Sequence, residues 1–236
     1  MSYETFSYYY DSLMDESFYD DYANFINNHI KEYHHVLELG CGSGELALRI
    51  ANHCDEYIAS DYSSSMLEVF SNKISLNSNI KLKNIDMIHF ESISYFDLII
   101  CACDSINYIL NKKDVFKVFK NVYQALLNDG YFIFDVDSLY KTDIILNNYH
   151  EYDDDDEFNF DWTCKLKSSG NIVHNIHIKD KVNDISVDEV HHQITYPIND
   201  YVEMLKNVGF KDISYYYDFD ESYNKEAERI IFIVKK

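Results

Sequence analysis

Three of the six glycines in the 236-residue chain stand in one five-residue loop. They are Gly40, Gly42 and Gly44, and the loop follows the apolar stretch 36–39 and opens a predicted helix over about 44–51. Because glycine has no Cβ, the main chain of such a loop can lie directly against a ligand. The N-terminus of the following helix adds N–H groups that have no partner within the helix. This pattern of strand, loop and helix predicts a site for an extended adenosyl ligand.

Two acidic residues at the ends of predicted strands are candidates to bind the same ligand as this loop. Glu38 stands two residues before the first glycine, and Asp61 follows a second predicted strand, 57–59. A carboxylate at that strand end can accept hydrogen bonds from both hydroxyls of a ribose. The alternative for Asp61 is to cap the next helix, a role that Ser63 could fill instead. Position 45 is glutamate rather than the third glycine of a dinucleotide fingerprint, which disfavours a pyrophosphate ligand.

The spacing Glu38-x-Gly40-x-Gly42-x-Gly44 resembles motif I of the class I S-adenosylmethionine (SAM) methyltransferases. The resemblance implies SAM as the cofactor, S-adenosylhomocysteine as its product, and a doubly wound, Rossmann-like α/β sheet of seven strands. It also implies that Asp86 and Met87, after a third strand over 80–85, clamp the adenine, although Met87 could instead be core filler. The residues that the resemblance assigns to the cofactor are Tyr10, Tyr19, Glu38, Gly40, Cys41, Gly42, Gly44, Asp61, Tyr62, Met66, Asp86, Met87 and Cys103.

The start of the chain carries a second resemblance. Residues 6–14 are similar to the F-A-x-x-Y-D-x-L-M opening of many small bacterial methyltransferases, in which a helical segment closes over the cofactor. This match implies that Tyr10 and Tyr19 lie beside the methionine end of SAM, where an aromatic face can attract a sulfonium. The alternative is the core packing of an amphipathic helix through residues such as Tyr22 and Ile26.

These motifs lie in a region where predicted strands alternate with predicted helices. Such alternation is typical of a parallel sheet. The further core elements that we predict are strands over 96–101 and 131–136, a helix over 115–127, a helix over 199–208, and a closing pair of strands over 212–217 and 229–234. The SAM-binding domain is therefore predicted to comprise residues 1–137 and 197–236.

Between these two parts the hydropathy changes to a period of two residues, which indicates strands. Strands are predicted over 158–166, 172–178 and 186–196, with a hairpin turn at Gly170. We therefore expect residues 138–196 to form an antiparallel β insertion that caps the active site. Its free edge could pair with a second copy of the chain in a homodimer.

Family members place the methyl donor and acceptor against the segment after the fourth strand, here 102–108. Tyr108 and His191 are the predicted catalytic residues, because an acceptor amine must lose a proton before it attacks. The residues predicted to bind the acceptor are Asn107, Trp162 and Gln193.

Polar residues share one face of the third inserted strand, because side chains alternate between the two faces of a strand. These residues are Glu189, His191, Gln193 and Thr195. The row is either a wall that binds the acceptor or a polar side that faces solvent.

Composition excludes several partners. The chain carries 20 basic and 41 acidic residues, a net charge of −21, and this disfavours binding to nucleic acid. No apolar run reaches the length of a membrane span, and the start of the chain does not resemble an export signal. Five cysteines without a CxxC pair predict neither a disulfide framework nor a metal site. The sequence therefore predicts a cytoplasmic protein.

The predicted function is transfer of a methyl group from SAM to a nitrogen or oxygen of a small molecule. The insertion after the fifth strand is similar to that of amino-sugar and glycine N-methyltransferases. Pro197 is the only proline, so no N/D-P-P-Y/F motif exists and methylation of adenine N6 is disfavoured. The alternatives are an RNA or protein methyltransferase, a protein that binds SAM without transferring methyl groups, and an NAD-dependent enzyme.

Overall fold

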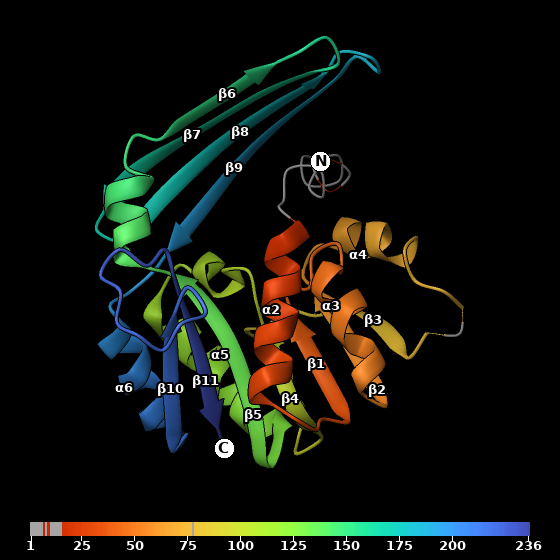
Figure 1. Cartoon of the computed structure of the whole chain (residues 1–236), viewed down its shortest axis with the longest axis vertical. Coiled ribbons are helices and arrows are strands. Elements are labelled where there is room, and N and C mark those ends of the chain that lie inside the picture. The colour runs from red at the N-terminus through yellow and green to blue at the C-terminus, as the bar shows by residue number, and fades with distance from the viewer. Residues whose placement is uncertain (1–6, 8, 10–15, 77) are drawn as a thin grey trace.

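The chain forms two β-sheets in the computed structural model, which describes residues 16–76 and 78–236 together with Ser7 and Tyr9 (Figure 1). Sheet A has seven strands in the order β10-β11-β5-β4-β1-β2-β3, and sheet B has four in the order β6-β7-β8-β9. The predicted seven-stranded sheet and its antiparallel β insertion are both confirmed.

Sheet A is a mostly parallel sheet. Its strands are β1 (His35–Leu39), β2 (Glu56–Asp61), β3 (Ile80–Asn84), β4 (Phe96–Cys101), β5 (Leu126–Asp137), β10 (Asp212–Tyr217) and β11 (Arg229–Lys235). Strands β1 to β5 run parallel to one another, whereas β11 is antiparallel to its neighbours β5 and β10. Because the carboxyl ends of parallel strands meet at one edge, the loops after β1, β2 and β4 lie side by side there.

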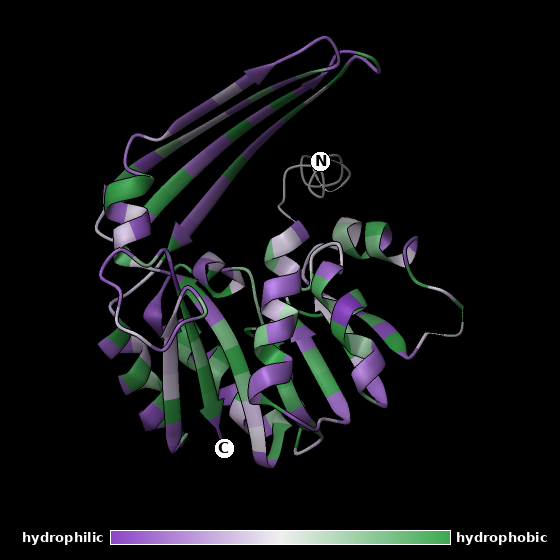
Figure 2. Ribbon diagram, in the orientation of Figure 1, coloured by the Kyte–Doolittle hydropathy of each residue, from purple (hydrophilic) through white to green (hydrophobic). Residues whose placement is uncertain are grey.

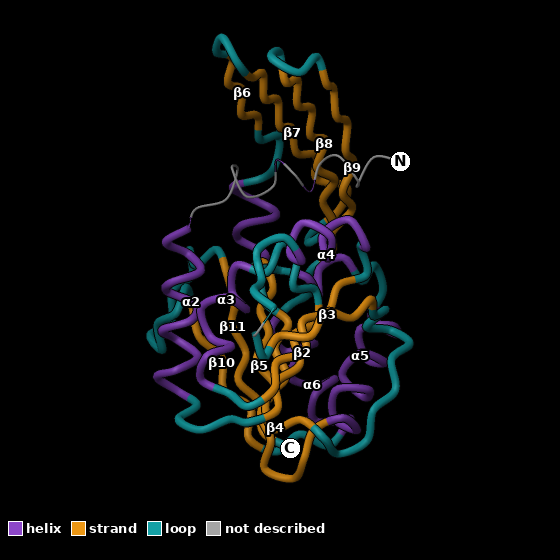
Figure 3. Tube along the Cα trace, turned by 90° about the vertical axis from the view of Figure 1, so that its right-hand side faces the viewer, coloured by secondary structure: helices purple, strands orange, loops and turns teal. Residues whose placement is uncertain are grey.

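Helices cover both faces of sheet A. They are α2 (Glu16–His29), α3 (Glu45–Ile50), α4 (Ser64–Ser71), α5 (Lys112–Ala125) and α6 (Ile198–Val208). Helices α2 and α3 lie on one face, and α5 and α6 on the other (Figure 3). Within the described residues, no helix is both long and apolar enough to span a membrane.

Each face of sheet A has its own hydrophobic core. The side chains of Tyr22 and Ile26 on α2 are fully buried, so the alternative interpretation of core packing by an amphipathic helix is confirmed for these residues. On the other face the ring of Phe134 stacks on Phe132 at 4.8 Å and on Phe232 at 4.7 Å. Burying each such side chain stabilises the fold by roughly 1.5–3 kcal/mol, and this fixes the strands whose ends carry the site.

Sheet B projects from the carboxyl edge of sheet A (Figures 1 and 3). Its antiparallel strands are β6 (His150–Asp154), β7 (Phe158–Ser168), β8 (Asn171–Asp180) and β9 (Ile185–Ile194). Gly170, at a φ of +73°, makes the predicted turn between β7 and β8. The edge strands β6 and β9 are mainly hydrophilic, unlike the central strands of sheet A (Figure 2).

Strand β6 includes the first part of the acidic run 153–157, which its charge alone would suggest is a solvated loop. Asp153 and Asp154 belong to β6, which pairs with β7. All five residues of β6 are exposed. An edge strand with both faces in solvent shows no alternation of apolar residues, so hydropathy did not reveal it.

Candidate functional site

The glycine loop joins β1 to α3, and Gly40, Gly42 and Gly44 all have a positive φ, of +72°, +53° and +87°. A Cβ on Gly40 would lie 2.6 Å from the Ser105 Oγ, and one on Gly44 would lie 2.3 Å from the ring of Phe70. These two glycines are therefore required by packing. A Cβ on Gly42 would meet no atom of the described residues within 4 Å. The loop thus keeps an open space over Gly42 that a side chain would fill and a ligand can occupy.

Asp61 lies beside this loop at the end of β2. One carboxylate oxygen accepts a hydrogen bond from the Gly42 N–H at 2.8 Å, and the other accepts one from the Ser63 N–H at 2.7 Å. The cap of α4 is Ser63, whose Oγ accepts from the Met66 N–H at 3.3 Å. Burial raises the pKa of Asp61, against the opposing effect of these N–H groups. Each carboxylate oxygen has two lone pairs, so both can still accept a ribose hydroxyl.

Glu38 is buried at the end of β1, with 2% of its surface exposed. Its Oε2 accepts a hydrogen bond from the Tyr57 hydroxyl at 3.0 Å. Burial raises the pKa of Glu38 to about 7, although the bond from Tyr57 lowers it. A carboxyl group with this pKa can become negatively charged when a cation binds close to it.

Asp86 and Met87 follow β3. The Asp86 carboxylate accepts a hydrogen bond from the Ile88 N–H and contacts the His89 Nδ1, each at 2.8 Å. Met87 lies against the glycine loop, because its Cε would be 3.7 Å from a Cβ on Gly40. Met87 therefore has the location that an adenine clamp needs, and the clamp stays a prediction.

Tyr62 and Met66 follow β2. Tyr62 is 76% exposed, whereas Met66 on α4 is buried and belongs to a small apolar cluster with Ile178 and Val187 of sheet B. The cofactor roles of Tyr62 and Met66 stay predictions.

Tyr10 lies outside the described residues. Its neighbour Tyr9 donates a hydrogen bond to Asp180 at 2.9 Å, and its ring meets that of Phe158 at 5.7 Å. Tyr19 is buried in the core against α3. Tyr9 therefore contacts the end of β8 at Asp180 and the start of β7 at Phe158.

Cys41 and Cys103 lie on the loops after β1 and β4. Burial raises the pKa of both thiols well above the ordinary value. Both groups are therefore protonated at neutral pH, which fits packing roles and not a nucleophilic one.

Tyr108 and His191 meet where the short helix η2 (Ser105–Tyr108) approaches β9. The Tyr108 hydroxyl is 3.0 Å from the His191 Nδ1, and the two rings pack edge to face at 5.8 Å. Burial lowers the pKa of His191 to about 4, and the nearby His174 lowers it too. The imidazole is therefore neutral at pH 7 and can accept a proton.

Asn107 and Gln193 have amides that are held by other protein groups. The Asn107 Nδ2 donates to the carbonyl of Ile194 at 3.0 Å, and its Oδ1 accepts from the Asp137 N–H at 3.2 Å. The Gln193 Nε2 donates to the Asp104 carboxylate at 2.7 Å. Both residues connect sheet A to β9, and they are better placed to position the site than to bind an acceptor directly.

Trp162 lies on the same face of sheet B as His191. Strand register pairs Cys164 with His174 and His174 with His191, and Trp162 is two residues from Cys164. The indole N–H donates to the His174 Nδ1 at 3.2 Å, and the two rings stack at 5.8 Å.

Strand β9 buries its polar side. Glu189, His191 and Gln193 are 3%, 6% and 5% exposed, whereas Val190 is 54% exposed. A strand with one face in solvent normally buries its apolar side. The solvent-facing alternative for this polar row is therefore wrong, and the arrangement favours a wall that meets a polar molecule.

Sequence reasoning missed a buried ion cluster next to this wall. The Arg229 guanidinium contacts the carboxylate of Asp104 at 3.3 Å and that of Asp135. Asp135 is fully buried and also accepts a hydrogen bond from the Tyr22 hydroxyl at 2.9 Å. Two signals were available, because Arg229 is one of only two arginines and Asp135 interrupts the apolar run 131–136.

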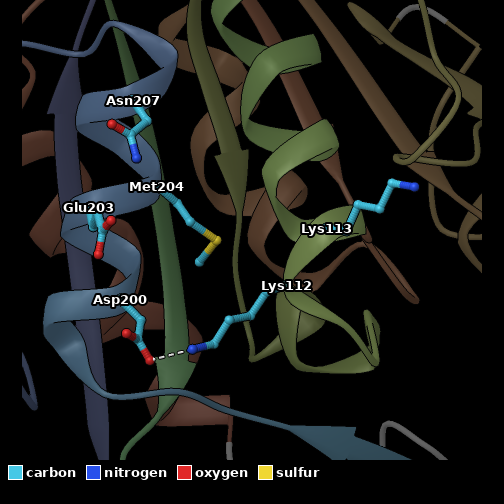
Figure 4. Close-up of a pocket in the computed structure, with 6 residues that line it drawn as sticks. All are labelled: Lys112, Lys113, Asp200, Glu203, Met204 and Asn207. Carbon is cyan, nitrogen blue, oxygen red and sulfur yellow. Dashed lines mark hydrogen bonds and ion pairs between the residues drawn. The ribbon is translucent and has the colours of Figure 1, made fainter.

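A surface groove of about 270 Å³ lies elsewhere, between α5 and α6 (Figure 4). It is lined by Lys112, Lys113, Asp200, Glu203, Met204 and Asn207. An ion pair of 2.7 Å between Lys112 and Asp200 bridges the two helices. The groove is lined by different residues from those predicted for the site, and we assign it no part in the reaction.

Comparison with known proteins gives consistent matches. Residues 36–130 match the family model of a methyltransferase domain. The chain is 34% identical, over the whole length of both proteins, to a methyltransferase-family protein of Geobacillus sp. (strain WCH70).

Two crystal structures share the fold. An S-adenosylmethionine-dependent methyltransferase from Clostridium acetobutylicum is 29% identical, with a TM-score of 0.87, over 99% of this chain and 98% of that one. The sugar N-methyltransferase KedS8 from Streptoalloteichus sp. has a TM-score of 0.76 at 15% identity, over 97% of this chain and 91% of that one.

The residues at the carboxyl edge of sheet A fit SAM. The open space over Gly42 can hold part of the ligand. The Asp61 carboxylate can still accept hydrogen bonds from hydroxyl groups, and the buried Glu38 carboxyl suits a cationic ligand. Together with the full-length match to a relative, these features show that the chain belongs to the SAM-dependent methyltransferase family, with SAM as its cofactor.

Proposed function

We propose that this enzyme methylates a nitrogen or oxygen of a small polar molecule that binds between β9 and the carboxyl edge of sheet A. The buried polar face of β9 carries the proposal, because Glu189, His191 and Gln193 are turned away from solvent. In this proposal residues 138–196 recognise the acceptor, and residues 1–137 and 197–236 bind the cofactor. The shared fold with a sugar N-methyltransferase supports an acceptor of this size and polarity.

When bound, SAM supplies an electrophilic methyl group, so the protein residues mainly have to orient the acceptor and remove its proton. Tyr108 is 42% exposed, and its hydroxyl lies within hydrogen-bond distance of the His191 Nδ1. In the proposed step the acceptor gives a proton to the Tyr108 oxygen while the Tyr108 proton moves to Nδ1. His191 is in the neutral form that this step requires, because burial lowers the pKa of its imidazole to about 4, and its Nδ1 lies within hydrogen-bond distance of the Tyr108 hydroxyl.

The acceptor class is tested with methyl-labelled SAM. The enzyme is incubated with amino sugars, amino acids and small hydroxyl compounds, and in parallel with RNA and with protein extract. We expect label in the small-molecule reactions. Label that enters only RNA or only protein would overturn the proposal.

The roles of Tyr108 and His191 are tested by Tyr108→Phe and His191→Asn. Each variant should lose at least tenfold in the methyl-transfer rate, with little change in SAM affinity, because Tyr108 on η2 and His191 on β9 belong to other segments than the glycine loop between β1 and α3. His192→Asn is the matched control, since His192 is the next residue of β9 and is exposed on its outer face. Equal rates for His191→Asn and His192→Asn would exclude the proton-accepting role.

A further inference from the structure

The chain turns sharply after β4, immediately before η2. Cys103 and Asp104 both have a positive φ, of +56° and +51°. Non-glycine residues in this region carry strain of about 1–3 kcal/mol each and persist where the surrounding contacts hold them. This turn sets the course of η2, because the Asn107 N–H donates to the Asp104 carbonyl at 2.8 Å. The position of Asp104 therefore determines where Tyr108, the last residue of η2, is placed.

The contacts of Asp104 hold this turn from three directions. Its N–H donates to the Asp135 carboxylate on β5 at 2.9 Å. Its Oδ1 lies 3.3 Å from both terminal nitrogens of Arg229 on β11. Its Oδ2 accepts from the Gln193 Nε2 on β9 at 2.7 Å. Two of these partners belong to sheet A and the third to sheet B.

Gln193 and His191 are two residues apart on the same face of β9. Gln193 is bound by Asp104 at the start of the turn, and His191 is bound by Tyr108 at the end of η2. The two contacts join the same pair of segments, so the first fixes the spacing on which the second depends. A displacement of β9 from Asp104 would also separate His191 from Tyr108.

We propose that Asp104 and Gln193 are positioning residues, which clamp β9 to the end of β4 and thereby hold His191 against Tyr108. The inference rests on the proposed function in that Tyr108 and His191 are the proposed proton-accepting pair. Arg229 and Asp135 complete the clamp, since Arg229 on β11 holds the Asp104 carboxylate and Asp135 on β5 accepts a hydrogen bond from the Asp104 N–H.

The clamp is tested by variants that remove or exchange the Gln193 amide and the Asp104 carboxylate. Gln193→Glu places two carboxylates side by side, and Gln193→Leu removes the hydrogen-bond donor without adding charge. The double variant Asp104→Asn, Gln193→Glu restores a donor and an acceptor in exchanged positions and keeps the total charge of the wild type. The double variant is therefore the matched control for both single changes.

The primary readout is the titration of His191 in isotope-labelled protein by NMR, which does not require an acceptor. The titratable groups near His191 include Tyr108 on η2, His174 on β8, Asp104 after β4, His192 on its own strand and Glu189 on the same buried face of that strand. When β9 moves away, the imidazole becomes hydrated, and its pKa should rise from about 4 toward the ordinary 6.5. We expect this rise in Gln193→Glu and Gln193→Leu, and a return toward the wild-type value in the double variant.

A His191 titration that is unchanged in Gln193→Leu, or that is not restored in the double variant, would overturn the clamp. SAM affinity is measured on each variant and should stay within about threefold of the wild type, which shows that sheet A is intact. The two proposals fail separately. If the titration follows the clamp but His191→Asn transfers methyl groups at the wild-type rate, the clamp stands and the proton-accepting role falls.

Discussion

The pH dependence of stability should carry a signature of Glu38. Its pKa is about 7 in the folded chain, against an ordinary value of 4.5. Between these pH values the folded state holds a proton that the unfolded state has lost. The free energy of unfolding therefore falls as the pH rises from about 4.5 to about 7. At about 1.36 kcal/mol per pH unit, Glu38 accounts for a loss of about 3 kcal/mol.

Glu38→Gln removes this titration, while the new side-chain oxygen can still accept the hydrogen bond from Tyr57. Relative to the wild type, the variant should gain about 3 kcal/mol in unfolding free energy between pH 4.5 and pH 8. Urea unfolding followed by circular dichroism at several pH values measures this difference. In a chain of this size the change corresponds to roughly 6–12 °C in the melting midpoint.

Glu45→Gln is the control of opposite sign. Burial alone would raise the pKa of Glu45, but Lys73 and Arg49 lower it below the ordinary value. That variant should therefore lose stability at pH 8, and the loss should fade as the pH falls through the range where Glu45 titrates. A difference between Glu38→Gln and the wild type that stays constant from pH 4.5 to pH 8 would refute the reasoning.

Three further predictions concern the cofactor site and the thiols. Asp61→Asn should weaken SAM binding at least tenfold in calorimetry, about 1.4 kcal/mol, because it removes a charged acceptor; unchanged affinity would exclude a ribose contact. Gly42→Ala should fold with about 1–2 kcal/mol of backbone strain but abolish the rise of the melting midpoint with SAM, since the new Cβ enters the open space. Gly40→Ala is its counterpart and should already destabilise the protein without SAM, because its Cβ meets Ser105. A normal SAM response in Gly42→Ala would exclude the open space as the ligand site, and an unchanged melting midpoint in Gly40→Ala would contradict the packing argument. Burial raises the pKa of Cys54 from 9.0 to about 11, so its alkylation at pH 8 should be about 100-fold slower in the native than in the urea-unfolded chain, and a rapid native phase would count against this.

Much of the cofactor site could be predicted from the sequence because its requirements are local. The residues concerned lie at the end of a strand or in the loop immediately after it. The three glycines have a positive φ and follow β1, one acidic residue lies at the end of β1, and another lies at the end of β2. Their chemistry depends on backbone conformation and on the parallel sheet, and both leave a pattern in the sequence.

The acceptor side was less predictable, because it depends on contacts between distant segments. The period of β9 placed His191 and Gln193 on one face, but it could not reveal that the Gln193 amide is bound by Asp104, 89 residues earlier. Arg229 and Asp135 are 94 residues apart, and only the pairing of β5 with β11 joins them. The sequence marks Arg229 as one of two arginines and Asp135 as a break in an apolar run, but only the tertiary structure determines that these two residues meet.

The seam at the base of sheet B is made of hydrogen bonds from Tyr108, Gln193 and Asn107. Water can replace such bonds when two surfaces separate, at a net cost of about 0.5–1.5 kcal/mol for each. An apolar contact surface of similar extent would be harder to separate, because exposing it to water costs a free energy of roughly 25 cal/mol for every Å². Separating the two sheets at this seam therefore costs less free energy than separating an apolar seam of similar extent, and the same three hydrogen bonds define the register in which β9 meets η2 and the end of β4.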